Sequence, residues 1–209
     1  MAIDGPAGAG KSTIAKALAR RLGLEYLDTG AMYRAVTQAA LMGGIDPGDT
    51  EAVRDLADRC ELSVTDGRTL IDGVDVSVAI RGSAVTAAVS MVASNSGVRE
   101  AMRRRQRRWG DDRRGGVIEG RDIGSVVFPD ARLKIYLTAS ARVRAERRVA
   151  EVGGDVDEME ALIADRDHKD STRTDSPLLT VPDAVVVDTG GRSVDAIVEE
   201  IARMYEEGR

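Results

Sequence analysis

Residues 5–12 read Gly-Pro-Ala-Gly-Ala-Gly-Lys-Ser and fill the G-x-x-x-x-G-K-[ST] frame of a phosphate-binding P-loop. Apolar residues 1–3 before the loop predict a strand, and residues 13–22 after it predict a helix. Glycines let consecutive backbone N–H groups curl around a phosphate, and the helix N-terminus adds partial positive charge. This context predicts an α/β chain that binds a nucleoside triphosphate.

Two side chains of this loop have expected roles in phosphate chemistry. Lys11 can reach the β- and γ-phosphates of a nucleotide, and the Ser12 hydroxyl can ligate Mg²⁺. A glycine-rich turn with a chance Lys-Ser pair is the alternative, and the flanking strand and helix weigh against it. The residues expected to bind ATP are Gly5, Pro6, Ala7, Gly8, Ala9, Gly10, Lys11, Ser12 and Thr13.

Composition narrows the class of protein further. The chain has 209 residues, 43% of them hydrophobic, which suits a single α/β unit with an insertion. Its net charge of −5 weighs against a general nucleic-acid binder. A single cysteine, Cys60, rules out an internal disulfide and favours a reducing, cytoplasmic compartment. No stretch approaches the ~18 consecutive apolar residues of a membrane span, and the chain shows no heptad pattern, so we expect a monomer.

Apolar runs and turn signals predict the order of the elements. Five buried strands of a parallel sheet are expected at residues 1–4, 25–28, 116–119, 133–138 and 184–188. Helices are expected at residues 31–42, 50–59, 83–93, 98–109, 141–152, 156–167 and 194–207. Short strands separated by turns predict a small antiparallel sheet at residues 61–65, 68–71 and 74–76.

This pattern predicts a P-loop kinase core whose five-stranded parallel sheet is flanked by helices. The core comprises residues 1–42, 97–146 and 176–209. Residues 43–96 form an inserted acceptor-binding module with the antiparallel sheet, and residues 147–175 form a helical lid. Because a closing lid keeps water from the γ-phosphate, this plan is typical of a kinase that acts on small molecules.

Two segments place polar residues at the carboxyl edge of the sheet, where open α/β sheets bind ligands. Arg34 lies about one helical turn after Gly30, so it can point into that crevice; a solvated arginine on a capped helix is the alternative. Glu119 ends an apolar strand and is expected near Mg²⁺. Arg121 offers a planar, bidentate fork to an anionic acceptor, with a local surface ion pair to Asp122 as the alternative.

Arginines recur in and beside the predicted lid. Arg166, Asp170 and Arg173 share one helix face, which favours an array that closes over phosphate, or else a ladder of solvent ion pairs. An arginine delivered to the transition state accelerates phosphoryl transfer by ~10³–10⁵, so we expect at least one from the lid. A second set also shares one face: Arg144, Arg147 and Arg148. The candidate catalytic residues are Lys11, Arg121, Arg147, Arg148 and Arg166.

Residues 99–108 contain six arginines and, taken alone, look like a nucleic-acid-binding stripe. No stacking aromatics are interleaved, and the chain is acidic overall. We therefore favour a solvated helix face with one or two arginines directed toward substrate.

The combination resembles the bacterial cytidylate kinases from the first strand to the last. The matching segments are residues 5–12, 27–34, 98–101, 119–124, 127–131 and 166–173. The P-loop is widespread, whereas Gly-Arg-Asp-Ile-Gly at residues 120–124 and the strand-rich insertion are much narrower signatures. The resemblance implies transfer of a phosphoryl group from ATP to CMP or dCMP, with Mg²⁺.

The resemblance also implies roles at matching positions. The CMP phosphate would be held by Arg34 and Arg121. The cytosine edge would be read by Ser90, Arg99 and Asp122, with Asp122 accepting from the exocyclic amine. The residues facing ribose and phosphates would be Thr29, Arg166, Asp170 and Arg173, and those near the donor phosphates Arg144, Arg147 and Arg148. Two positions depart from the pattern, because many relatives carry Ser where Thr29 stands and Asp where Glu119 stands.

Two other functions stay open at this point. One is another P-loop kinase that phosphorylates UMP, AMP or an acceptor such as shikimate. The other is a nucleotide-dependent switch or binding module, although the guanine-reading tetrapeptide N-K-x-D does not occur in the chain.

Overall fold

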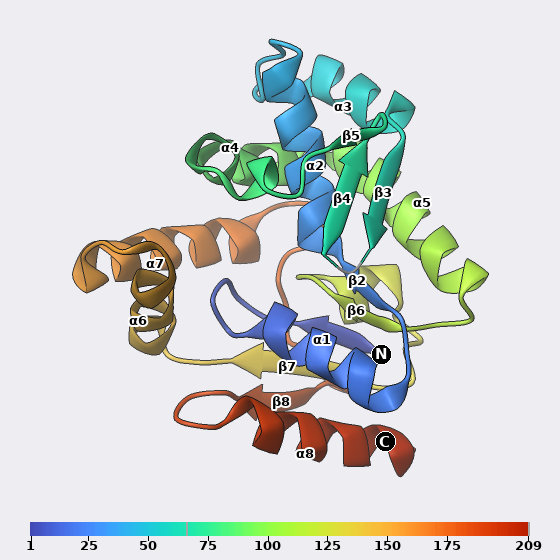
Figure 1. Ribbon diagram of the computed structural model, residues 1–209, viewed down its shortest axis with the longest axis vertical. Helices are drawn as coiled ribbons and strands as arrows, with labels where there is room; N and C mark the ends of the chain where they lie inside the picture. Colours follow the sequence, from blue (N-terminus) through green and yellow to red (C-terminus); the bar gives the residue numbers. More distant parts are fainter. Residues whose placement is uncertain (66, 209) are drawn as a thin grey trace. The chain divides into compact units, whose positions relative to one another are not determined.

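A computed structural model describes residues 1–65 and 67–208 of the chain (Figure 1). Contacts along the backbone divide it into two units. Unit 1 comprises Met1–Glu25 and Gly115–Arg209, and unit 2 comprises Tyr26–Arg114. The predicted antiparallel module, residues 43–96, falls within unit 2, and the predicted lid, residues 147–175, falls within unit 1. The division into core, module and lid stays a prediction.

The larger sheet has the strand order β2-β6-β1-β7-β8. Its strands are β1 (Ala2–Asp4), β2 (Tyr26–Asp28), β6 (Val117–Glu119), β7 (Lys134–Thr138) and β8 (Val185–Asp188). Strand β1 pairs in parallel with β6 and β7, and β7 pairs in parallel with β8. The register sets Ile3 opposite Glu119, so β1 and β6 end side by side where the P-loop begins. The predicted five-stranded parallel sheet is confirmed.

Four helices of unit 1 accompany this sheet: α1 (Lys11–Leu22), α6 (Ala141–Val152), α7 (Val156–Thr172) and α8 (Val194–Glu206). Helix α1 packs on β6 and α8 and buries Ile14 and Leu18. Helices α6 and α7 pack against each other, as Figure 1 shows. A short π-helix, η2 (Ile123–Val127), follows β6 and contacts β1.

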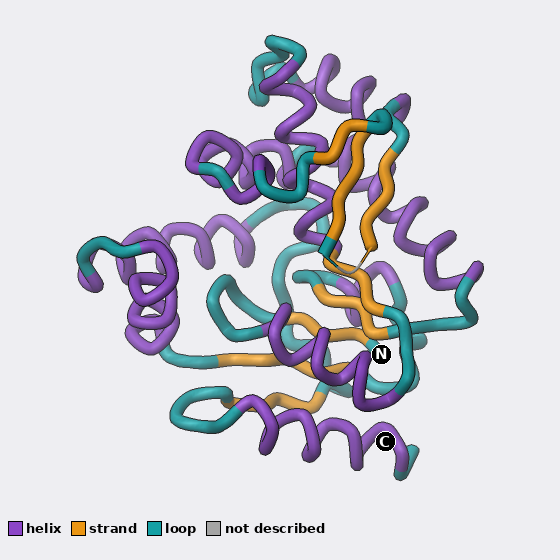
Figure 2. Tube along the Cα trace, viewed as in Figure 1, coloured by secondary structure: helices purple, strands orange, loops and turns teal. Residues whose placement is uncertain are grey.

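Unit 2 combines helices with the small antiparallel sheet, whose order is β3-β4-β5 (Figure 2). Its strands are β3 (Leu62–Thr65), β4 (Arg68–Ile71) and β5 (Val74–Asp75). Its helices are α2 (Thr29–Met42), α3 (Thr50–Arg59), the 3₁₀ turn η1 (Ala79–Arg81), α4 (Ser83–Ser94) and α5 (Ser96–Asp112). Side chains of Asp28, Asp49 and Asn95 cap α2, α3 and α5, as short polar residues before a helix commonly do.

Several element bounds differ from the sequence-based expectation, and two of these differences lie beside the predicted site residues Asp122 and Asp170. Helix α7 continues to Thr172, beyond the predicted end at residue 167. The prediction stopped short because the last residues of this helix are polar and carry no apolar period. The π-helix η2 forms where no helix is predicted, since its five residues are too few to show a helical pattern.

The P-loop backbone adopts conformations that favour glycine. Gly5, Gly8 and Gly10 have φ values of 148°, 77° and 84°. A Cβ added to Gly5 would lie 2.1 Å from the backbone oxygen of Leu137 in β7. The loop can therefore pass this close to the backbone of β7 only because residue 5 has no side chain.

We predict that Gly5→Ala destabilises the protein by about 3 kcal/mol, because the clash adds to the backbone strain. The control is Gly23→Ala at the end of α1, where φ is 63° and nothing lies within 4 Å of an added Cβ. That control should cost about 1 kcal/mol, the strain term alone. Urea unfolding followed by circular dichroism measures both, and equal losses would contradict the clash.

Candidate active site

The N-terminal end of α1 is open toward an anion. Helix α1 begins at Lys11, directly after Gly10, which has no side chain with which to cap it. Its first turn holds no acidic residue, and Ser12 and Thr13 are exposed. The positive end of the helix dipole and two hydroxyl groups are thus available where a bound phosphate would lie.

Lys11 lies beneath the loop rather than in solvent. Its side chain is buried, and Nζ donates to the Pro6 carbonyl oxygen at 2.8 Å. Burial is the largest cause that lowers the pKa of the Lys11 ammonium, the Arg121 and Arg166 cations act in the same direction, and the Glu119 carboxylate opposes them, so that the pKa falls to about 7. Like charges therefore gather around this ammonium, and a polyphosphate would relieve their repulsion.

The end of β6 and the end of α7 meet through an ion-pair network. Arg121 donates from Nε to Oδ2 of Asp170 at 2.8 Å. The Arg173 guanidinium lies 3.7 Å from Oδ1 of Asp122 and 3.8 Å from Oδ1 of Asp170. Burial alone would raise the pKa of Asp170, but the charge and hydrogen bond of Arg121, together with the Arg166 and Arg173 cations, outweigh it and hold that pKa below its usual range. Four of the predicted substrate residues are thus brought together in unit 1.

Asp4, at the end of β1, was not among the predicted site residues. Its carboxylate accepts from the backbone N–H of Ile123 at 2.9 Å and of Gly124 at 2.7 Å. Burial raises the pKa of Asp4 to about 6, against the effect of these two donors. A carboxylate that ends the apolar run before the P-loop is the sequence signal that could have identified it.

The predicted lid arginines on α6 differ in their surroundings. Arg144 is buried and donates to the carbonyl oxygens of Ala7, in the P-loop, and of Ala139, both at 3.0 Å. It also pairs with Asp167 of α7 at 2.6 Å. The Arg144 guanidinium therefore holds the P-loop backbone through Ala7 and connects the P-loop to α7.

Arg147 and Arg148 point to different environments. Arg147 donates to Oγ1 of Thr189 at 2.9 Å and to its carbonyl oxygen at 2.6 Å, and its Nη1 lies 3.8 Å from the Cβ position of Gly10. Arg148 pairs with Glu151 at 2.9 Å on the helix surface. Arg147 is thus the one of these two that lies against the P-loop.

Unit 2 holds the other predicted substrate residues, Thr29, Arg34, Ser90 and Arg99. Thr29 is buried at the start of α2, and Ser90 is half-buried on α4. Arg34 donates from Nη1 to the Ile80 carbonyl oxygen and to Oγ1 of Thr86, both at 3.0 Å. Arg99 is buried on α5 and donates to the Ala93 carbonyl oxygen at 3.1 Å.

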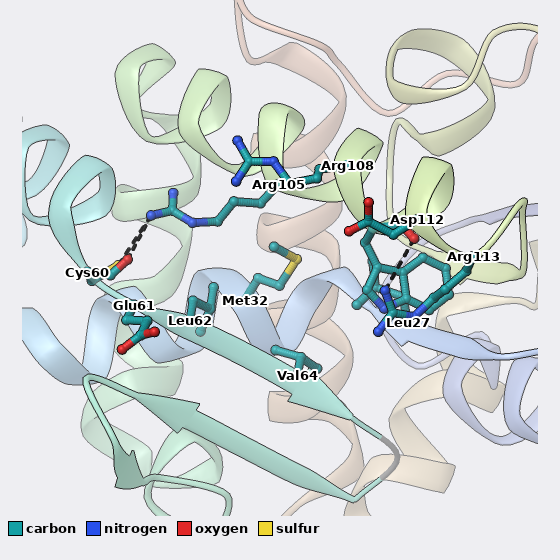
Figure 3. A pocket seen from close by; sticks show the side chains of 11 residues that line it. Leu27, Met32, Cys60, Glu61, Leu62, Val64, Arg105, Arg108, Asp112 and Arg113 are labelled. Carbon is teal, nitrogen blue, oxygen red and sulfur yellow. Dashed lines mark hydrogen bonds between the residues drawn. The ribbon is translucent and has the colours of Figure 1, made fainter.

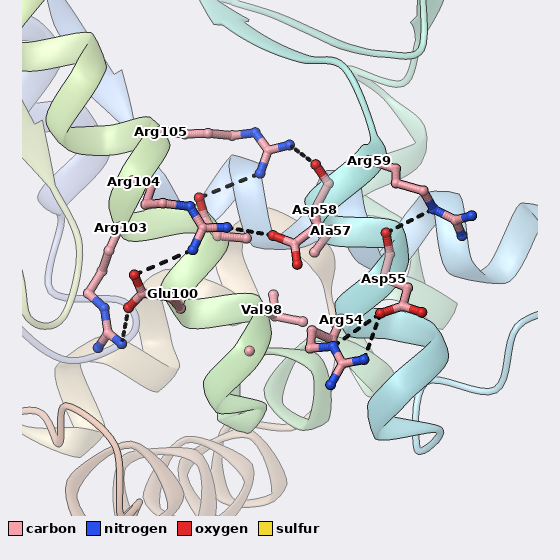
Figure 4. A network of polar contacts seen from close by, with 12 residues as sticks. Arg54, Asp55, Ala57, Asp58, Arg59, Val98, Glu100, Arg103, Arg104 and Arg105 are labelled. Atoms are coloured by element: carbon pink, nitrogen blue, oxygen red, sulfur yellow. Dashed lines mark hydrogen bonds and ion pairs between the residues drawn. The ribbon is translucent and has the colours of Figure 1, made fainter.

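The arginine-rich face of α5 makes contacts inside unit 2 (Figure 4). Arg103 and Arg104 both pair with Glu100, at 3.0 and 3.4 Å. Arg104 also reaches Asp58 of α3 at 2.5 Å, and Arg105 donates to the Asp58 carbonyl oxygen at 3.2 Å. These contacts attach α5 to α3 and favour a structural role for much of the arginine run.

A cavity of about 330 Å³ lies in unit 2 between β3 and α5 (Figure 3). Met32, Leu62 and Val64 give it apolar walls, and Arg105 of α5 and Arg113, directly after α5, also line it. None of the eleven residues lining it is among the predicted nucleotide-binding residues. It therefore does not coincide with the predicted site.

The side chains near Lys11 suit a magnesium ion that is bound together with a nucleotide. Among residues 1–65 and 67–208, no group of three or more His, Cys, Asp or Glu could hold a metal by itself. Mg²⁺ commonly takes one or two protein oxygens and completes its shell with substrate phosphates and water. The exposed Ser12 hydroxyl and the buried Glu119 carboxylate fit that donor set.

None of the helices in the described part of the chain is long and apolar enough to span a membrane.

A P-loop at the carboxyl edge of a parallel sheet, with arginines from the next strand and a following helix, defines a P-loop kinase. Residues 1–207 match the family profile described as cytidylate kinase. A cytidylate kinase from Mycolicibacterium paratuberculosis is 51% identical over 96% of this chain and 92% of its own length. The chain therefore belongs to the cytidylate kinase family, as the sequence resemblance implies.

One further comparison supports the family and another concerns the fold. A bifunctional pantoate ligase/cytidylate kinase from Parasynechococcus marenigrum is 48% identical over 98% of this chain, which spans 43% of that protein's length. The crystal structure of an uncharacterised protein from Eubacterium ventriosum covers 100% of this chain with a TM-score of 0.58 at 13% identity. The second likeness concerns the fold alone.

We predict that binding of ATP takes up a proton at Lys11. Without ligand, Lys11 loses its proton above about pH 7, and a polyphosphate should return its pKa toward 10.5. The measurement is titration calorimetry in buffers of different ionisation heat, which should show uptake of a proton on ATP binding. A pH of about 8.5 is chosen because phosphate groups with a second pKa of ~6 are already ionised there. Lys11→Arg stays charged and should bind without uptake. Equal uptake by this variant would contradict the assignment.

Proposed function

We propose that this chain transfers the γ-phosphoryl group of ATP to CMP and dCMP, giving CDP and dCDP. The observation that carries the proposal is the meeting, within unit 1, of the buried P-loop lysine with Arg121 and the network that joins Asp122, Asp170 and Arg173. A phosphate-binding loop beside a second group of paired cations suits a reaction between two phosphorylated molecules. Membership of the cytidylate kinase family supports the choice of acceptor.

The P-loop would hold the donor. Backbone N–H groups of residues 5–13 other than Pro6, together with the Lys11 ammonium, would bind the β- and γ-phosphates of ATP. Mg²⁺, ligated by Ser12 with Glu119 nearby, would neutralise phosphate charge when bound. Because Lys11 now donates to Pro6 at 2.8 Å, it would exchange that carbonyl for a phosphate oxygen.

The acceptor would be held by its phosphate and read by its base. Arg34 and Arg121 would bind the phosphate, since a guanidinium matches phosphate oxygens with two parallel hydrogen bonds. The base would be read by Ser90, Arg99 and Asp122, while Thr29, Asp170 and Arg173 would face the ribose and phosphate. Asp122 can accept from the cytosine amine, whereas the uracil carbonyl would oppose one acceptor with another.

Phosphoryl transfer needs positioning and charge stabilisation more than proton transfer. Lys11 and Arg121 would neutralise charge on the transferring group from the two sides, with Arg166 from α7. Arg147 lies against the P-loop, whereas Arg148 pairs on the surface, so we assign the α6 contribution to Arg147. Arg144 would act through the loop, because its donors are used by backbone carbonyls and Asp167.

We also propose that the enzyme is a cytoplasmic monomer without nucleic-acid partners. The free, buried Cys60 suits a reducing compartment. The arginines of α5 that resemble a nucleic-acid stripe are engaged by acidic and carbonyl groups of their own unit.

We predict that Asp122→Ala lowers kcat/KM for CMP by about 100-fold or more and changes the UMP value far less, since sites that pair a substrate amine discriminate by up to ~10⁴–10⁵. ATP affinity should stay within about threefold, because the donor is held by the P-loop. Asp122→Asn, whose amide can donate to the uracil carbonyl, should raise UMP activity relative to CMP. Steady-state assays with both acceptors measure these ratios.

The matched control is Asp165→Ala on α7, an exposed carboxylate that pairs with Lys169 at 2.6 Å. It should leave the CMP-to-UMP ratio unchanged. Equal losses for the two bases in Asp122→Ala would contradict the assignment of Asp122 to base recognition.

A further inference from the structure

The π-helix η2 is capped by a residue from another strand. Its first two residues, Ile123 and Gly124, donate their N–H groups to the two carboxylate oxygens of Asp4, at 2.9 and 2.7 Å. Asp4 is 7% exposed and lies at the end of β1, so this carboxylate is held in place by the centre of the sheet.

Asp122 occupies the N-cap position of η2 but makes no capping hydrogen bond. An aspartate at that position commonly turns its carboxylate onto the N–H of the second or third helical residue. Here the N–H of Gly124, the second residue, is used by Asp4. The Asp122 carboxylate lies instead 3.7 Å from the guanidinium of Arg173, another residue expected to contact the acceptor.

The local packing is shaped around the Asp4 contact. A Cβ added to Gly124 would lie 3.4 Å from Oδ2 of Asp4 and 3.2 Å from the Lys134 side chain. Gly120 also donates its N–H to the Ile3 carbonyl oxygen at 2.9 Å. Residues 120 and 123–124 are thus both attached to the last residues of β1, which fixes the segment that carries Arg121 and Asp122.

We propose that Asp4 is a positioning residue that caps η2 in place of Asp122 and so keeps the Asp122 carboxylate available to the acceptor base. This inference rests on the proposed function, because it assigns a purpose to the Asp122 orientation. Asp4 itself touches backbone rather than substrate.

Electrostatics supports the division of roles between these two carboxylates. Burial raises the pKa of Asp4, the Gly124 and Ile123 N–H groups lower it, and the negative charge of Asp122 raises it again. The repulsion between the Asp4 and Asp122 carboxylates disfavours an arrangement in which both accept from the N–H groups of Ile123 and Gly124. With Asp4 on the N–H groups, Asp122 is directed away from them.

The test is Asp4→Asn, which keeps the size of the side chain but offers one acceptor oxygen and an amide that faces the second N–H. We expect Asp122 to turn onto the freed N–H, because a cap is worth about 1 kcal/mol and the repulsion from residue 4 is gone. The CMP-to-UMP ratio of kcat/KM should fall about tenfold through a raised KM for CMP, with ATP affinity within about threefold.

Two comparisons separate positioning from general damage. Asp188→Asn changes a carboxylate at the end of β8 that accepts the Gly190 N–H at 2.8 Å, and it should leave the ratio unchanged. Asp4→Glu, which restores a carboxylate, should recover part of the CMP preference. If Asp4→Asn fails to fold, Asp4→Glu alone still decides, because a longer carboxylate should shift the ratio while leaving ATP affinity intact.

Amide NMR signals of Ile123 and Gly124 provide a readout that does not depend on activity. In Asp4→Asn the signal of at least one amide should lose the downfield shift of a carboxylate-bonded N–H. An unchanged pair of amide signals, or equal losses for CMP, UMP and ATP, would overturn the proposal. If the wild-type protein does not turn over CMP, the proposed function is refuted instead. The amide signals would then still show whether Asp4 caps η2.

Discussion

The repulsion among cations beneath the P-loop is the constraint on which the site depends. Lys11 is buried close enough to Arg121 and Arg166 for both cations to add to the effect of burial, and together these causes lower its pKa to about 7. The negative charges of Glu119 and Asp4 raise the pKa of Lys11 but do not cancel the lowering. Such an arrangement costs stability in the unliganded protein and favours a ligand that carries several negative charges. A nucleotide polyphosphate is the ligand that this loop geometry can hold.

The short strand β1 connects the two halves of the reaction. It has three residues, is paired on both sides, and leads directly into the P-loop. Its last residue also holds the start of η2, next to Arg121 and Asp122. The P-loop and the segment that carries Arg121 and Asp122 are therefore both attached to one rigid strand end. A displacement of either segment reaches the other through few bonds. Arg144 adds a second connection, from the loop to α7.

Local sequence patterns were sufficient for the strands of the parallel sheet, for the α-helices apart from their exact ends, and for the P-loop, because each of these repeats at a period or fills a fixed frame. The roles of Arg121 and Asp122 were available mainly through the family resemblance, since an arginine–aspartate pair after a strand is common. Asp4 and the inward position of Arg144 were not predicted, because both act on backbone groups that are distant in the sequence. The extension of α7 escaped prediction for a related reason, since the polar residues at its end form ion pairs with Arg121 and Asp122, just after β6, and do not continue an apolar stripe.

The central claim is that this P-loop serves a cytosine-specific acceptor site. The most direct measurement is a coupled assay of ADP release with ATP and Mg²⁺, comparing CMP, dCMP, UMP, AMP and no acceptor. We expect turnover that requires an acceptor, with CMP and dCMP active and UMP and AMP nearly inactive. ADP release that is independent of the acceptor, or equally fast with UMP and CMP, would contradict it.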